Sequence, residues 1–63
     1  MKSYYFTVFN GNDLVAEDSS LGTDPYAAFE EFYLNNSLST YSSEIVVFCS
    51  LPRIGLEFKM EFS

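Results

Sequence analysis

The sequence contains one helical pattern, with two strand patterns on each side of it. Residues 22–25, Gly-Thr-Asp-Pro, predict a helix start, because an Asp or Thr side chain accepts bonds from the first amides and Pro suits the first helical position. At 100° per residue, four aromatic residues that follow lie within about 120° of one another: Tyr26, Phe29, Phe32 and Tyr33. We therefore expect a core-facing aromatic stripe, which can cover only one face of a sheet.

Two strand patterns precede the helix. Residues 2–9 are rich in aromatic and β-branched side chains and end at Asn10-Gly11, which predicts a tight hairpin turn. Residues 13–20 are the expected returning strand, with Leu14 and Ala16 on one face and Val15 and Glu17 on the other. The weak alternation and the charge of this segment are typical of an edge strand.

Two further strand patterns follow the polar connection 35–43. Residues 44–51 place Val46 and Phe48 on one side and four apolar residues on the other: Ile45, Val47, Cys49 and Leu51. After a turn at Pro52-Arg53, residues 54–62 alternate cleanly and predict a half-buried strand. Its apolar face comprises Ile54, Leu56, Phe58, Met60 and Phe62.

The order of these patterns is ββαββ, which predicts an α+β fold in one small domain, residues 1–63. The first and third strands are apolar on both faces, so we place them in the centre of a mainly antiparallel sheet of order 2-1-3-4. The alternative is a β-grasp-like mixed sheet in which strands one and four are parallel neighbours.

One face of such a sheet is left without a helix. If Tyr4, Phe6 and Val8 face the helix, an open side is expected with Tyr5, Thr7, Phe9, Val46 and Phe48; the opposite assignment exposes the first set instead. In both cases the centre of the open face is apolar and aromatic, which is typical of an interface. The competing interpretation is that the sheet curls, or that Leu38 and Tyr41 of the connection cover this face.

The chain is acidic, with nine acids, three bases and a formal charge of −6. Six acids lie within residues 13–31, where no base occurs: Asp13, Glu17, Asp18, Asp24, Glu30 and Glu31. This charge disfavours direct binding to nucleic acid or to anionic lipid, and it favours a basic partner. The cluster serves either solubility or a carboxylate array that takes the place of phosphates in a basic groove.

The residues needed for catalysis are missing. The chain has no histidine, so no Ser-His or Cys-His nucleophile and no imidazole metal ligand is available. Cys49 lies among apolar neighbours and is expected in the core, and Glu30 and Glu31 diverge by about 100° on a helix. We expect no enzymatic activity, no cofactor and no metal.

The expected compartment is the cytoplasm. No apolar run of about 18 residues and no secretory leader is recognised, and a single cysteine suits a reducing environment.

These features predict a small, non-catalytic binding protein that occupies a basic, nucleic-acid-binding surface of another protein. The expected contact residues are the six clustered acids with Tyr5, Phe9 and Phe48 as aromatic anchors. Chains of this kind are frequent among phage or mobile-element inhibitors of host proteins, such as anti-CRISPR or anti-restriction proteins and inhibitors of RNA polymerase. The alternative is a self-associating structural or accessory protein that forms a homodimer through its open sheet face.

Overall fold

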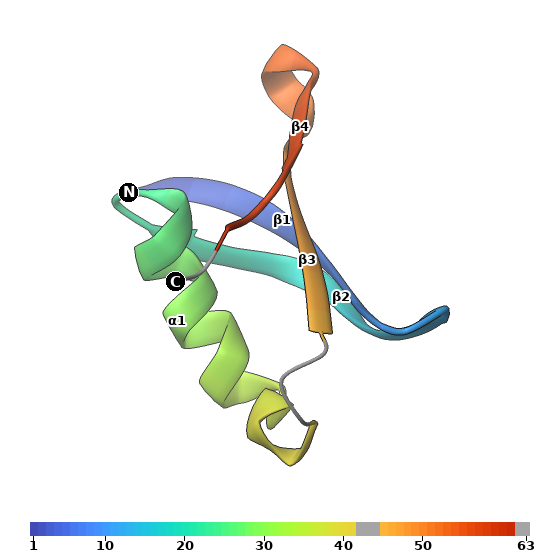
Figure 1. Cartoon of the computed structure of the whole chain (residues 1–63). Helices are drawn as coiled ribbons and strands as arrows, with labels where there is room; N and C mark the ends of the chain where they lie inside the picture. The colour runs from blue at the N-terminus through green and yellow to red at the C-terminus, as the bar shows by residue number, and fades with distance from the viewer. Residues whose placement is uncertain (42–44, 62–63) are drawn as a thin grey trace.

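The computed structural model describes residues 1–41 and 45–61, and in these it shows one sheet and one α-helix (Figure 1). The strands are β1 (Lys2–Asn10), β2 (Asp13–Gly22), β3 (Ile45–Leu51) and β4 (Leu56–Lys59), and the helix is α1 (Pro25–Asn35). Short 3₁₀ turns, η1 (Leu38–Thr40) and η2 (Pro52–Ile54), precede β3 and β4. None of the helical segments in the described ranges is long and apolar enough to cross a membrane.

The sheet is antiparallel throughout its described pairs, and its order is β2-β1-β3-β4. This confirms the predicted ββαββ arrangement with order 2-1-3-4. The β-grasp-like alternative is wrong, because β4 pairs with β3 across a short turn and not with β1.

The β1–β2 hairpin differs in detail from the prediction. Its turn residues are Gly11 and Asn12, one position later than expected, and Gly11 adopts φ +66°, which glycine tolerates without strain. A bulge makes Leu14 pair with Phe9 while Ala16 pairs with Val8. Because Phe9 and Val8 point to opposite faces, Leu14 and Ala16 do so as well, and the prediction that they share a face was wrong.

The helix begins as the sequence predicts. The Asp24 carboxylate (Oδ1) accepts hydrogen bonds from the amides of Tyr26 and Ala27, both at 2.9 Å, and Pro25 occupies the first turn. Behind this cap, Gly22 of β2 lies so close to Ala28 that a Cβ atom on Gly22 would lie 2.5 Å from the Ala28 nitrogen. The absence of a side chain at Gly22 therefore sets how closely α1 approaches β2.

The hydrophobic core lies between α1 and one face of the sheet. Phe6 is fully buried, and its ring centroid lies 5.4 Å from that of Phe29 and 5.3 Å from that of Phe32. The predicted stripe is therefore right for these two helix residues, and Tyr33 is half-buried against the core. Tyr26 was wrongly placed in the core: it is 49% exposed, and its hydroxyl donates to the Glu61 carbonyl oxygen at 3.2 Å.

Ala28 is the fully buried helix residue that the aromatic stripe missed. The close approach of α1 to Gly22 turns the helix so that Ala28 faces β2, and Tyr26 consequently lies outside the core. Cys49 is fully buried, as predicted, and burial raises the pKa of its thiol.

The β3–β4 hairpin extends beyond the helix. Pairing of β1 with β3 stops at Tyr5 and Ser50, whereas the hairpin continues to Leu51 and Leu56 (Figure 1). The last strand is accordingly shorter than the predicted 54–62, and Ile54 lies in η2, 71% exposed. Residues Glu44 and Phe62, predicted at strand ends, lie outside the described residues.

Candidate functional site

The face of the sheet opposite α1 is the candidate site. Tyr4, Phe6 and Val8 are buried toward the helix, at 4%, 0% and 0% exposure. Side chains alternate along a strand, so Tyr5, Thr7 and Phe9 point to the other face. The first of the two alternatives left open by the sequence is therefore the one that the protein adopts.

Three transverse rows of paired residues make up this open face. The central row runs from Glu17 on β2 through Thr7 and Phe48 to Lys59 on β4. On one side of it lies the row Ser19, Tyr5, Ser50 and Glu57, and on the other lies the row Leu14, Phe9 and Val46. We call these eleven residues the open face; aromatic and aliphatic groups are central, and its charged groups stand on the outer strands.

An aromatic pair occupies the centre of the open face. The ring centroids of Phe9 and Phe48 are 6.1 Å apart and the ring planes meet at 84°, an edge-to-face arrangement. Both residues are half-buried, as is Val46, and Leu14 beside them is 49% exposed. The pair is thus held in a fixed geometry while part of each ring stays accessible to a partner.

Tyr5 and Glu17 form the polar margin of the aromatic pair. The pKa of Tyr5 is raised, first by desolvation and then by the negative charge of Glu17, with a smaller contribution from Asp18. Tyr5 and Glu17 are diagonal neighbours on adjacent strands, since Tyr5 pairs with Ser19. At neutral pH this margin therefore presents a neutral phenol beside a carboxylate.

The described part of the connection between α1 and β3 does not cover the open face. Leu38 is 1% exposed and belongs to the core cluster that contains Phe6 and Phe32, and Tyr41 packs against the same cluster. Figure 1 shows η1 beside the end of α1, on the helix side of the sheet. The alternative in which Leu38 and Tyr41 cover the open face is not the one observed.

The six clustered acids do not gather on one surface. Asp13 and Gly22 lie at opposite ends of β2, nine positions or roughly 30 Å of extended strand apart, and Asp24 follows two residues after Gly22. Glu17 is on the open face, whereas Asp18 pairs with Phe6 and so belongs to the helix side. The Asp24 carboxylate accepts hydrogen bonds from the first amides of α1 and so caps the helix.

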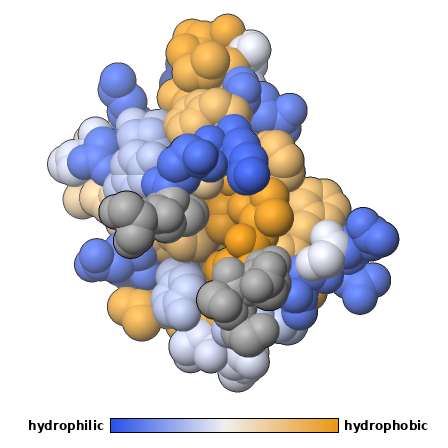
Figure 2. Space-filling view, viewed as in Figure 1, coloured by the Kyte–Doolittle hydropathy of each residue, from blue (hydrophilic) through white to orange (hydrophobic). Residues whose placement is uncertain are grey.

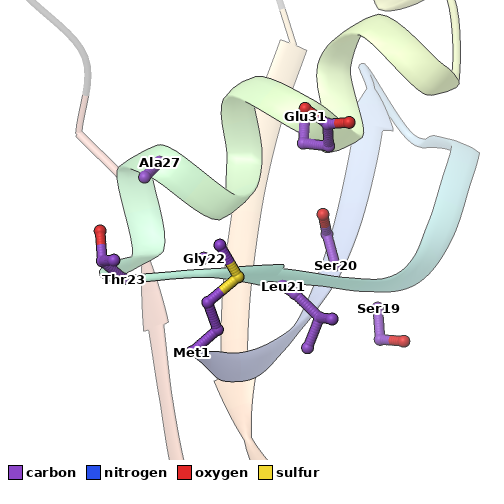
Figure 3. Close-up of a pocket in the computed structure, with 8 residues that line it drawn as sticks. All are labelled: Met1, Ser19, Ser20, Leu21, Gly22, Thr23, Ala27 and Glu31. Atoms are coloured by element: carbon purple, nitrogen blue, oxygen red, sulfur yellow. The ribbon is translucent and has the colours of Figure 1, made fainter.

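Glu30 and Glu31 leave the helix in different directions. Glu31 lines a shallow groove of about 620 Å³ between α1 and the end of β2. Figure 3 shows Ser20 on the same side of β2 as Glu31, while Ser19 and Leu21 point to the other side. Glu30 instead lies beside Tyr26, Tyr33 and Leu34 in a separate groove. Of the six acids, only Glu17 thus adjoins the aromatic anchors.

The polar groups of these surfaces do not form a metal-binding cluster in the described residues. No group of three or more His, Cys, Asp or Glu side chains in residues 1–41 and 45–61 is arranged to hold a metal ion. The groove in Figure 3 is lined by one carboxylate residue, Glu31, and by the hydroxyl residues Ser20 and Thr23. The chemistry available on the open face is apolar contact, hydrogen bonding and charge pairing.

Comparisons with protein-family models, with curated proteins and with solved structures found no match.

Sequence reasoning found the aromatic members of the open face but missed its borders. Leu14, Glu57 and Lys59 join this face because of the register between strands and the β2 bulge. The alternation of residues 54–62 already separated Glu57 and Lys59 from the apolar positions. That signal becomes useful only when the pairing of β4 with β3 is known.

Proposed function

We propose that this protein is a small non-catalytic binding protein whose open face docks on a basic surface of a partner protein. The partner class is a nucleic-acid-handling protein whose phosphate-binding surface the acidic chain occupies. Phage or mobile-element inhibitors of CRISPR or restriction nucleases, or of RNA polymerase, are the biological setting that suits this chemistry.

The observation that carries the proposal is the aromatic centre on the side of the sheet opposite α1, which no helix of the described residues covers. Phe9 and Phe48 are held edge to face, and only one helix is present in the described residues to cover the sheet. Aromatic side chains in a fixed geometry lose little entropy on binding and provide most of the energy in many interfaces. A net charge of −6 steers such a face toward a basic partner.

The area of the open face indicates that neighbouring surfaces take part. Four strands about 4.8 Å apart and five residues at about 3.3 Å each span roughly 320 Å². A stable interface buries about 800 Å² on each partner. The outer edge of β2 adjoins the open face, and the exposed acids along it, Asp13, Glu17 and Asp18, add charge of the required sign, although Asp18 points to the helix side.

Matched variants test the proposal in binding to a basic protein captured from a host-cell lysate. Phe48→Ser is expected to weaken binding by at least about 10-fold, as for a central aromatic anchor. The control Leu34→Ser removes an apolar side chain that is 69% exposed on α1, away from the open face, and should leave binding unchanged. Equal affinity of both variants would show that the partner does not use the open face.

A second pair of variants distinguishes electrostatic attraction of the partner by a charge on the open face from the effect of the net negative charge of the protein. Glu17→Gln and Glu30→Gln remove the same charge, one on the open face and one on the far side of α1. We expect Glu17→Gln to slow association several-fold at low salt and Glu30→Gln to have a smaller effect. Salt-insensitive binding would contradict the electrostatic part of the proposal.

A homodimer is the second candidate, and the central row of the open face favours it. When two open faces stack about a two-fold axis parallel to the strands, the order of the row is reversed in the second copy. Glu17 then faces Lys59 of that copy, and Thr7 faces Phe48. Such stacking pairs opposite charges and buries both aromatic centres, as in aligned sheet packing.

The mass in solution distinguishes the two candidates. A dimer of this kind is weakened by Glu17→Lys and restored by adding Lys59→Glu, which exchanges the two charges. A protein that stays monomeric at high concentration, measured by light scattering, would exclude the dimer and leave the heterologous partner as the proposal.

A further inference from the structure

The two hairpins separate at one end of the sheet. Pairing of β1 with β2 continues to Lys2 and Gly22, whereas pairing of β1 with β3 ends at Tyr5 and Ser50. Residues 2–4 are therefore paired on one side only. Figure 1 shows the β3–β4 hairpin projecting away from the β1–β2 hairpin beyond this point.

A groove of about 440 Å³ lies where the hairpins separate. Its apolar lining includes Met1, Leu21 and Ile54, which are 92%, 59% and 71% exposed. Figure 2 shows apolar residues gathered over the tip of the β3–β4 hairpin, at the top of the view. A volume of this size is within the range of pockets that hold small ligands or short peptide segments.

The groove is lined by basic side chains, although the protein as a whole is strongly acidic. Lys2 and Arg53 both line it, and they are two of the three bases in the chain. Neither side chain forms an ion pair within the described part of the chain. The third base, Lys59, is on the open face, paired with Phe48.

We propose that this groove binds an extended peptide segment of a partner protein in which carboxylates alternate with apolar side chains. The free side of residues 2–4 offers backbone groups to an added strand. Alternating side chains of that strand point to opposite sides, so apolar groups reach Leu21 and Ile54 while carboxylates reach Lys2 and Arg53. This inference goes beyond the proposed function, because it concerns a second surface that recognises the opposite charge.

An NMR titration of the full chain tests the inference. The probe is a blocked hexapeptide in which three glutamates alternate with three leucines, and the comparison probe carries lysines in place of the glutamates. We expect the glutamate peptide to shift the amide signals of residues 2–4 and of Leu51, Arg53 and Ile54. The lysine peptide should not shift these signals, although it is free to bind the acidic surfaces elsewhere.

Charge variants supply the matched control. The double variant Lys2→Gln with Arg53→Gln should weaken binding of the glutamate peptide about fivefold, and Lys59→Gln should change it by less than about twofold. All three bases are exposed, so the variants are expected to fold. No binding at millimolar peptide, shifts located elsewhere, or equal affinity for the double variant and Lys59→Gln would each overturn the inference. None of these results bears on binding through the open face, which the Phe48→Ser and Leu34→Ser pair tests independently.

Discussion

Replacing Gly22 by alanine tests the helix packing that leaves the other face of the sheet open. The added Cβ would lie 2.5, 2.7 and 2.8 Å from the nitrogen, Cα and Cβ atoms of Ala28. Two of these three atoms belong to the helix backbone, so a side-chain rotation cannot relieve the contact. The helix must move away from β2, and the core around Phe29 and Phe32 loosens with it.

The expected loss of stability follows from two opposing terms. Inserting one methyl group into a tightly packed site costs about 1–3 kcal/mol. Gly22 does not have a positive φ, so alanine can adopt its backbone conformation. The substitution therefore also stabilises the folded state by about 0.4–1 kcal/mol, because alanine lowers the entropy of the unfolded chain. The net destabilisation is about 1–2 kcal/mol, which lowers the melting temperature of a domain of this size by roughly 5–15 °C.

Thermal and urea denaturation followed by circular dichroism measure this change. Ala28→Gly in the same chain is expected to give no rescue, because the shortest contacts are to backbone atoms and glycine weakens a helix by about 1 kcal/mol. A Gly22→Ala protein as stable as the parent chain would refute the reasoning, since α1 would then not be held against β2 at the described distance.

Three further predictions concern the cap and the titrating groups. Asp24→Ala should cost about 0.5–2 kcal/mol in urea denaturation, because the amides of Tyr26 and Ala27 lose their acceptor, and Asp24→Asn should recover most of the loss. Glu17→Gln should lower the pKa of Tyr5 in an NMR titration, since the Glu17 charge helps to raise it; an unchanged pKa would show that Glu17 does not contribute and would leave desolvation and Asp18 as the causes. Stability should fall as pH rises above about 9, because Cys49 has a raised pKa in the folded state and the unfolded thiol loses its proton first; a flat denaturation midpoint between pH 8 and pH 10 would contradict this.

Much of the fold follows from local patterns in the sequence. The cap at Asp24 and Pro25 and the apolar character of β1 and β3 on both faces were sufficient to predict the helix start and the strand order. The β2 bulge could not be predicted, because the residue inserted at Val15 is an ordinary β-branched residue. The tight contact between Gly22 and Ala28 was also missed, since the position of a small residue in a packed contact depends on tertiary structure.

The candidate site was predicted less completely than the fold. Alternation identified Tyr5, Phe9 and Phe48 as members of one face, and the burial of Phe6 shows which face the helix covers. The six acids are close in the sequence, but they do not lie on one surface. Glu17 and Asp18 point to opposite faces of the sheet. Glu30 and Glu31 line different grooves of the helix. Lys2 and Arg53, which are 51 positions apart, are brought to one groove only by the hairpin arrangement.

The exposure of Val46 relative to Val47 tests the open face most directly. These neighbours in β3 point to opposite faces, and Val47 is 1% exposed toward the helix while Val46 is half-buried on the other side. A neutral paramagnetic cosolute, added to a dilute monomeric sample, should broaden the methyl NMR signals of Val46 strongly and those of Val47 weakly. Equal protection of both valines in a monomer would mean that the chain itself covers this face, and the proposed docking surface would then not exist.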